Sequence, residues 1–264
     1  MPVADWSGVN ERMPLNPVVV IPVYNHPSTV GAMAQGVLQH AGLPCILVND
    51  GSTPECAAVM NAIALRYCGQ VQVLHLPHNQ GKGGAMMAGL RLALKQGFTH
   101  AVQIDADGQH CTADIPKFLR LASACPQAMV CGVPLYDASV PKARLYGRYA
   151  THIWVWINTL SLEIKDSMCG FRVYPLASTV ALFDRVKLGQ RMDFDTEVLV
   201  RLHWQGVRVV SLPTQVTYPQ DGISHFDVWR DNLKISRMHA LLFVGMLWRS
   251  PQLLIRNLRR GLVS

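Results

Sequence analysis

The chain has 264 residues, half of them hydrophobic, which suffices for one large α/β domain with a sizeable core. Its formal net charge of +7 favours anionic partners, namely nucleotides, phosphates, an acidic membrane surface or nucleic acid. The seven cysteines contain no Cys-x-x-Cys pair, which argues against structural zinc, and no apolar stretch reaches about 18 residues, so no transmembrane helix is expected.

Residues 1–16 are polar and lack the apolar segment of a secretory signal. We therefore expect a loose N-terminal arm and, because the number of cysteines is odd, reduced thiols in a cytoplasmic protein.

The first half of the chain alternates between strand-like and helix-like segments. Short apolar runs predict buried strands at 17–23, 44–48, 71–76 and 99–104. Helical spacing lies between them at 29–40, 55–68 and 86–96, with Ser28 as the N-cap of the first helix. This βαβαβαβ order predicts parallel strands joined by crossover helices.

The second half is less regular but shows no linker and no internal repeat. It predicts helices at 114–124, 146–160 and 194–205 and strands at 128–133 and 207–212. We expect one α/β domain over 17–220, with a nucleotide-binding first half (17–112) and a second half (113–220). A C-terminal amphipathic helical extension is expected over 221–264.

Two acids, Asp105 and Asp107, directly follow the strand at 99–104. Ligands of open α/β sheets bind at such strand ends, and two acids separated by one residue can share a hard divalent cation with a diphosphate. Asp-x-Asp alone is a weak pattern, and two solvated loop acids that cap the next helix explain it equally well. The pair becomes more informative beside the loops that follow the other strands.

The four predicted strands all end in polar loops, namely Pro22-Val23-Tyr24-Asn25, Asn49-Asp50-Gly51-Ser52-Thr53, Asn79-Gln80-Gly81-Lys82-Gly83 and Asp105-Ala106-Asp107-Gly108. In this order they resemble the family 2 glycosyltransferases with the GT-A fold. They are similar in particular to the dolichyl-phosphate mannose synthase branch, which has a similar Asp-Ala-Asp-Gly-Gln-His run and a motif like Cys169-Gly170-Phe171-Arg172. The resemblance covers roughly 17–220 and implies a Rossmann-like sheet with helices on both faces.

The resemblance implies a nucleotide-sugar site, with a UDP- or GDP-sugar as donor. Tyr24 would lie against the base, unless Pro22 and Tyr24 form a simple strand exit. Asn25 and Asp50 would contact the base or the ribose, and Asp50 could also cap the following helix together with Ser52 and Thr53. The glycine-rich loop would let the backbone approach the nucleotide, with a flexible turn before a helix as the alternative. Asp107 would hold Mg or Mn against the two phosphates. His26 stands where the family usually has an acid. The expected donor contacts are Pro22, Tyr24, Asn25, Asp50, Gly51, Ser52, Gly81, Lys82, Asp105, Ala106 and Asp107.

By this resemblance 17–112 is the nucleotide-sugar half and 113–220 the acceptor half. The acceptor half carries a second acidic motif before the helix at 194–205. The family often has Glu-Asp before a helix that ends in Leu-His-x-x-Gly, and alignment on that ending places Asp195 at the catalytic aspartate and Phe194 at the usual glutamate. Glu197 is the next acid and a second catalytic candidate. A hydroxyl acceptor would need a general base here, whereas a phosphate acceptor would not, and helix capping is the alternative role of Asp195.

Basic residues in the second half are candidates for phosphate contacts. In the lipid-phosphate branch, arginines near this region hold the acceptor phosphate, which suggests Arg144, Arg148 and Arg172 here. A surface position is the alternative for Arg172. His225 is expected to approach the metal or the diphosphate, with a structural role as the alternative.

The C-terminal tail alternates basic and apolar residues and contains no acid after Asp231. This pattern fits an interfacial helix on anionic lipid, or a helix packed on the domain with a solvated basic face. The apolar run at 239–248 is too short to span a membrane. A Gln-x-x-Arg-Trp motif is absent, which argues against processive polymer extension.

These features predict a metal-dependent, inverting glycosyltransferase. It would move one sugar to a lipid-linked or amphipathic acceptor such as a polyprenyl phosphate, in glycolipid synthesis at the cytoplasmic face of the cell membrane. A sugar-phosphate nucleotidyltransferase should instead carry a glycine- and arginine-rich loop where Tyr24-Asn25-His26-Pro27 stands. A nucleic-acid or lipid-surface binding module lacks stacking motifs to support it. A Rossmann dehydrogenase lacks its G-x-G-x-x-G.

Overall fold

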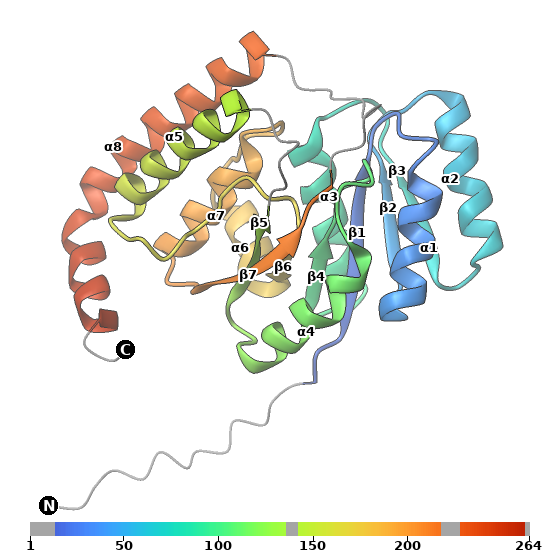
Figure 1. The fold of residues 1–264 in the computed structure, drawn as a ribbon, viewed down its shortest axis with the longest axis horizontal. Helices are drawn as coiled ribbons and strands as arrows, with labels where there is room; N and C mark the ends of the chain where they lie inside the picture. The colour runs from blue at the N-terminus through green and yellow to red at the C-terminus, as the bar shows by residue number, and fades with distance from the viewer. Residues whose placement is uncertain (1–13, 136–141, 218–227, 262–264) are drawn as a thin grey trace, which may run out of the picture.

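The computed structural model describes residues 14–135, 142–217 and 228–261. Within these residues the strands form one mixed sheet with helices on both faces (Figure 1). The strands are β1 (Pro17–Val23), β2 (Cys45–Asn49), β3 (Val71–His75), β4 (His100–Gln103), β5 (Met129–Leu135), β6 (Arg172–Pro175) and β7 (Val209–Gln215). The helices are α1 (Val30–Ala41), α2 (Pro54–Arg66), α3 (Lys82–Lys95), α4 (Ile115–Ala124), α5 (Lys142–Thr159), α6 (Leu176–Arg185), α7 (Phe194–Trp204) and α8 (Val228–Gly261), with a 3-10 turn at Thr112–Asp114.

The strand order is β3-β2-β1-β4-β6-β5-β7. β1 pairs in parallel with β2 on one side and with β4 on the other, so the chain reverses its direction of winding at β1. The loops after β1 and β4 therefore diverge at a switch point, where open α/β sheets bind ligands. β6 runs antiparallel to both β4 and β5 and joins the two halves of the sheet. The predicted α/β class, with a Rossmann-like first half, is confirmed.

Alternating side chains of the strands feed two separate hydrophobic cores. In β1, Val18 and Val20 belong to the core beneath α3, α6 and α7, whereas Val19 and Ile21 belong to the core beneath α1, α2 and α4. This alternation follows from the two-residue period of a strand. Helices cover both faces of the sheet. The carboxyl ends of the strands, where the loops begin, are therefore left to form the site.

Several predicted boundaries differ from the structure. α3 begins at Lys82 rather than at residue 86, because the glycines that read as a loop form its first turn. The N-cap of α1 is Thr29, not Ser28. β6 and α6 were not predicted. Asn16, placed in the loose arm, donates its backbone N–H to Thr99 Oγ1 over 2.9 Å. The rest of the arm lies largely outside the described residues.

Helix α8 has 34 residues and lies alongside α5 (Figure 1). Its buried side chains, including Met238, Leu242 and Met246, join the core shared with α5 and α7. Arg256 Nη1 donates to the carbonyls of His203 (2.6 Å) and Trp204 (3.1 Å) at the end of α7. The extension is thus integrated into the fold. None of the helices in the described ranges combines the length and hydropathy needed to cross a membrane.

Candidate active site

The loops after β1 and β2 are tied to each other by polar side chains. Asn25, in the left-handed region with φ 55°, accepts a hydrogen bond from the Thr53 backbone N–H at 2.8 Å. Ser52 Oγ accepts from the Asn25 N–H (3.1 Å) and donates to the Val23 carbonyl (3.2 Å). Asn25 and Ser52 therefore shape the two loops, and the half-buried Tyr24 and Pro22 stand at the same strand end.

Asp50 connects the second loop to the third. Its carboxylate accepts hydrogen bonds from the backbone N–H groups of Gln80 (2.6 Å) and Gly81 (2.9 Å), at the start of α3. Burial raises the pKa of Asp50, and these two hydrogen bonds oppose the rise. Asp50 therefore holds the backbone just before α3 and does not cap α2, the helix that follows it, whose N-cap is Thr53, so the capping alternative is wrong. With 2% of its surface exposed, Asp50 offers little area for direct contact with a ribose.

The glycines of the third loop make room for the protein itself. A Cβ at Gly81 would lie 2.5 Å from the Gln190 carbonyl oxygen, and one at Gly83 would lie 2.5 Å from Phe194 Cβ. The Gly84 N–H also donates to the Gln190 carbonyl at 3.0 Å. The backbone that approaches these glycines is that of residues 189–194, and the expectation that they also admit the nucleotide stays a prediction.

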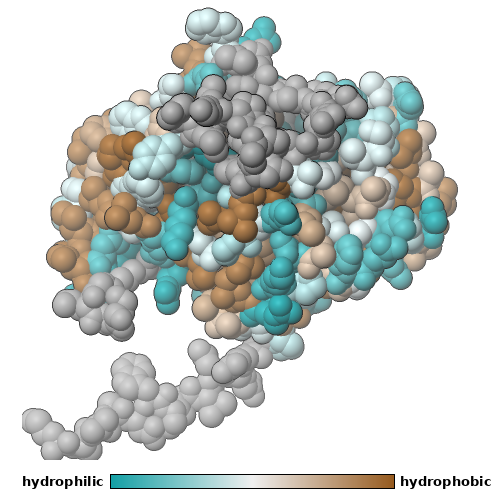
Figure 2. All heavy atoms as spheres, in the orientation of Figure 1, coloured by the Kyte–Doolittle hydropathy of each residue, from teal (hydrophilic) through white to brown (hydrophobic). Residues whose placement is uncertain are grey.

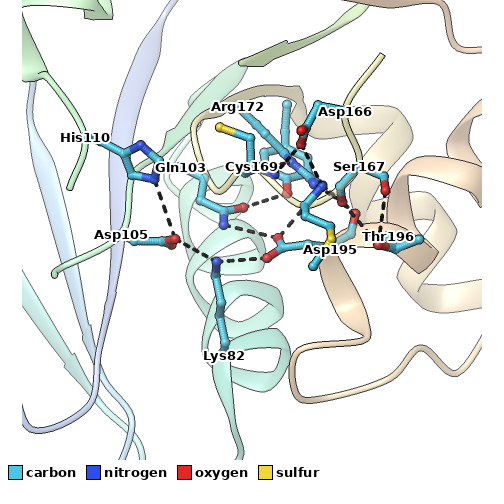
Figure 3. A network of polar contacts seen from close by, with 12 residues as sticks. Lys82, Gln103, Asp105, His110, Asp166, Ser167, Cys169, Arg172, Asp195 and Thr196 are labelled. Atoms are coloured by element: carbon cyan, nitrogen blue, oxygen red, sulfur yellow. Dashed lines mark hydrogen bonds and ion pairs between the residues drawn. The ribbon is translucent and has the colours of Figure 1, made fainter. Parts of the chain in front are cut away.

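Lys82 lies at the centre of the site, between the two halves of the domain (Figure 3). Its Nζ is 2.8 Å from Asp105 Oδ2 and 2.8 Å from Asp195 Oδ2. Burial disfavours the charged ammonium, but the two carboxylates outweigh this effect and hold the pKa of Lys82 above its ordinary value. The charge expected to face the nucleotide is thus already shared by two acids.

The two acids after β4 have different environments. Burial opposes ionisation of Asp105, but Lys82 and the His110 ring, whose Nε2 is 3.7 Å from Asp105 Oδ2, hold its pKa below the usual range. Burial and then the negative charge of Asp105 raise the pKa of Asp107. Asp107 Oδ1 accepts from the Gln109 N–H at 3.0 Å, and Thr29 Oγ1 donates to the Ala106 carbonyl at 2.5 Å, which fixes the loop.

The donor set suits a hard cation that also binds a diphosphate. Asp105 Oδ1 is buried and has no hydrogen-bond partner among the described residues. A cation held by Asp107 and this oxygen would be coordinated by carboxylate oxygens, as Mg²⁺ and Mn²⁺ prefer, with the phosphates completing the shell. Within the described ranges no group of three or more His, Cys, Asp or Glu forms a complete metal site. His225, the other expected contributor, lies outside these ranges.

Asp195 reaches the site from the first turn of α7. It is 5% exposed, and its Oδ1 accepts a hydrogen bond from Gln103 Nε2 at 3.2 Å. Gln103 Oε1 in turn accepts from the Tyr174 hydroxyl at 2.6 Å. Asp195 and Asp105 therefore contact the same lysine, although they lie 90 residues apart in the sequence.

Two predicted site residues have structural roles. Arg172 is completely buried and donates to the backbone carbonyls of Cys169 (2.7 Å), Ser167 (2.7 Å) and Asp195 (2.5 Å), so the prediction of a phosphate contact is wrong. Glu197 is 6% exposed, accepts from the Gly189 N–H at 2.7 Å and pairs with Arg201 at 2.7 Å. Glu197 braces the segment before α7, and its predicted catalytic role stays a prediction.

Of the basic residues of α5, Arg148 joins this network through Asp166, whose Oδ1 also accepts from the Cys169 N–H at 2.7 Å. Arg148 makes a bidentate contact with Asp166, at 2.6 and 2.7 Å, and His152 Nε2 lies 3.3 Å from the same carboxylate. These groups hold the pKa of Asp166 well below its usual range although burial opposes this. Arg144 lies one helical turn before Arg148 on α5, and its side chain is outside the described set. The acceptor role of Arg144 and Arg148 remains a prediction.

Sequence reasoning missed Gln103, Tyr174, His110 and Asp166. Gln103 had a recognisable signal, because it interrupts an otherwise apolar strand two residues before Asp105. Tyr174 had none, since its strand was not predicted.

Comparisons with known proteins identify a family and several relatives that this chain resembles. Residues 18–189 match the profile described as Glycosyl transferase family 2. The polyprenol monophosphomannose synthase of Mycolicibacterium smegmatis is 30% identical, over 78% of this chain and 79% of its own length. The undecaprenyl-phosphate mannosyltransferase of Micrococcus luteus is 26% identical over 74% and 81%. The dolichyl-phosphate beta-glucosyltransferase of Mus musculus is 28% identical over 69% and 61%.

Solved structures share the same fold. Glucosyl-3-phosphoglycerate synthase from Mycobacterium tuberculosis, in complex with Mn²⁺ and UDP-glucose, has a TM-score of 0.64 and 14% sequence identity. The likeness covers 88% of this chain and 79% of that one. At this identity it speaks for the fold alone.

Proposed function

Because the chain belongs to glycosyl transferase family 2, we propose that it moves one sugar from a UDP- or GDP-sugar to a polyprenyl phosphate or a similar lipid-linked acceptor. Family membership makes it a glycosyltransferase and displaces the nucleotidyltransferase and the non-enzymatic binding module as readings of the sequence. The observation that carries the proposal is the position of Asp105 and Asp107 at the switch point of the sheet, with the Asp105 Oδ1 unpartnered.

The donor half would bind the nucleotide sugar at the ends of β1, β2 and β4. Tyr24 and Asn25 stand beside the loop after β4 and would receive the nucleoside. Asp107 and Asp105 would hold Mg²⁺ or Mn²⁺. Such a bound ion stabilises the negative charge of the departing nucleoside diphosphate. The fixed loops would orient the sugar for attack from the face opposite the leaving group, with inversion at the anomeric carbon.

The carboxylates on the acceptor side favour an acceptor that is already anionic. A hydroxyl needs a base within hydrogen-bond reach, whereas a phosphate oxygen does not. Both oxygens of Asp195 are engaged, by Lys82 and Gln103, and Glu197 is engaged by Arg201 and the Gly189 N–H. The relatives named for polyprenol, undecaprenyl phosphate and dolichyl phosphate add support for a lipid phosphate.

We further propose peripheral contact with an anionic membrane at its cytoplasmic face, through α5 and α8. Both helices carry exposed large apolar side chains, among them Trp154 (45% exposed) and Trp248 (87%). Exposed basic residues on α8, namely Arg230, Lys234, Arg237 and Arg259, would face anionic headgroups. In Figure 2 apolar side chains gather at the left of the molecule, where Figure 1 has these two helices.

Release of nucleoside diphosphate from a panel of sugar nucleotides, with polyprenyl phosphate and Mn²⁺ or Mg²⁺, tests the catalytic proposal. We expect one sugar nucleotide to give turnover that requires both the lipid phosphate and the cation. Asp107→Ala should lower this turnover more than tenfold, since even changes in the groups around metal ligands typically cost about 10–100-fold. Asp184→Ala, at an exposed ion pair on α6, is the matched control. Unchanged turnover in Asp107→Ala would exclude its role at the metal.

A further inference from the structure

Lys82 is shared by two acids that come from opposite halves of the domain. Asp105 follows β4 on the donor side, and Asp195 lies at the start of α7 on the acceptor side. Each presents its Oδ2 to the Lys82 ammonium at 2.8 Å (Figure 3). Side-chain exposures of 16% for Lys82 and 8% for Asp195 mean that water screens this pair weakly.

Asp195 is held on every side by the protein. Its Oδ1 accepts from Gln103 Nε2 at 3.2 Å and lies 3.8 Å from the guanidinium of Arg172. Its own backbone carbonyl accepts from Arg172 Nη1. Behind it, the Tyr174 hydroxyl donates to Gln103 and fixes the orientation of that amide. A proton acceptor needs an oxygen that an acceptor hydroxyl can reach, and this carboxylate is buried with both oxygens engaged.

Asp105 differs from Asp195 in one respect that matters for binding. Its Oδ2 is bonded to Lys82, but its Oδ1 is left without a partner among the described residues. Lys82 therefore fixes one oxygen of Asp105 and leaves the other for a ligand. Without a second counter-ion, the flexible lysine side chain would have no fixed position from which to do this.

We propose that Asp195 is a positioning residue that acts through Lys82: it holds the ammonium against Asp105 Oδ2 so that Asp105 Oδ1 stays directed at the donor and its cation. This inference rests on the proposed function for the identity of the donor. It assigns Gln103 and Tyr174 to the same chain of contacts, as props of Asp195. Removal of a proton from the acceptor is not a task of Asp195 in this assignment.

The decisive experiment compares Asp195→Asn, Lys82→Met and the double variant. Lys82→Met leaves two buried carboxylates facing each other and the diphosphate, so we expect donor kcat/KM to fall at least tenfold and the Kd for nucleoside diphosphate with Mn²⁺, from calorimetry, to rise. Asp195→Asn should raise the donor KM and the nucleotide Kd, because Lys82 loses one of its two charged partners, while kcat stays within tenfold of the wild type. The double variant has one negative charge fewer than Lys82→Met and should be more active than Lys82→Met.

A general base would give the opposite pattern. If Asp195→Asn lowers kcat by more than tenfold with an unchanged nucleotide Kd, and the double variant is no more active than Lys82→Met, the positioning role is overturned. General bases typically contribute about 10²–10⁴-fold, so the two outcomes are well separated. Wild-type protein that binds no nucleoside diphosphate at all would instead count against the proposed function.

Tyr174→Phe keeps the test open if Lys82→Met does not fold. It removes only the hydroxyl that supports Gln103, and thermal unfolding monitors its stability. We expect a donor KM two- to fivefold higher with kcat unchanged. A lower kcat at unchanged KM would contradict the proposal, because it would mean that the chain of contacts serves the chemical step.

Discussion

Arg172 illustrates how a buried charge can be satisfied almost entirely by backbone. A guanidinium has five N–H donors in a fixed plane, and three carbonyls accept from it here. These carbonyls belong to the segment at 167–169 and to the first turn of α7, so one side chain links two parts of the acceptor half. The residue is therefore part of the scaffold that holds Asp195.

Replacing Arg172 with Met should destabilise the protein without affecting acceptor binding. The change removes the partner of several buried carbonyls and leaves Asp195 less compensated, which should cost about 3–5 kcal/mol in the free energy of unfolding. Denaturant unfolding measures this cost, with Arg91→Met at an exposed ion pair expected to stay within about 0.5 kcal/mol. An Arg172→Met variant with unchanged stability and a raised acceptor KM would instead support the predicted phosphate contact.

The N-terminus of α3 shows why glycines occur in the third loop. Residues 189–194 cross over the first turn of the helix, and the Gln190 carbonyl accepts the Gly84 N–H. Ordinary side chains at Gly81 and Gly83 would overlap this segment. The same glycines thus allow Lys82 to start the helix and to lie between its two acids.

Gly83→Ala should therefore destabilise the protein even though alanine favours helix. The new Cβ would lie 2.5 Å from Phe194 Cβ and 2.8 Å from the Gly189 carbonyl oxygen, an overlap that should cost about 1–3 kcal/mol. Gly147→Ala, in α5 with nothing within 4 Å of the new Cβ, should instead stabilise by about 0.5–1 kcal/mol. Thermal unfolding compares the two, and equal shifts would refute the close approach at α3.

Short-range sequence patterns predicted the strands and helices of the first half of the chain. Apolar runs gave β1 at its observed limits, and the other strands and the helices α1 and α2 within about two residues. α3 was placed four residues late because glycine reads as a loop when its packing partner is unknown. β6 was missed because it has four residues, begins with Arg172 and ends with a proline.

The sequence allowed candidate site residues to be named within single loops, but it did not reveal the tertiary contacts between them. Asp105, Asp107 and Asp195 could be selected because they follow or begin regular elements. The link through Lys82 joins residues 82, 105 and 195, and only the pairing of β4 with β6 and the packing of α3 beside α7 bring them together. Arg172 was misassigned for the same reason, since a short sequence does not reveal which carbonyls surround a cation.

At the scale of the molecule, an ion pair links the segment beside the proposed donor site to the α5–α8 pair. Arg191 belongs to the segment that covers α3, and its Nε donates to Asp231 Oδ1 in the first turn of α8 at 3.2 Å. Asp231 is 1% exposed, whereas the side chain of Arg191 is 37% exposed, so water reaches one partner of this contact. α8 then runs along α5 and ends against α7, with one apolar stripe buried and another exposed. A membrane that binds the exposed stripe would therefore contact a helix that the Arg191–Asp231 pair joins to the segment over α3.

The exposed stripe of α8 should drive binding to anionic membranes. Leu241, Val244 and Trp248 recur at helical spacing with exposed fractions of 56%, 66% and 87%. We expect the protein to sediment with vesicles of phosphatidylglycerol and phosphatidylcholine more than with phosphatidylcholine alone, and less so at high salt, because nearby Lys and Arg contribute about 1 kcal/mol each. Trp248→Asp should weaken this binding about tenfold or more, since it removes a large interfacial ring and adds a negative charge. Leu65→Asp, at an 81% exposed position on α2, is the matched control and should bind as the wild type does. An equal loss of binding in both variants would show that binding is not specific to the α8 stripe. No loss in either variant would exclude this face as the membrane contact.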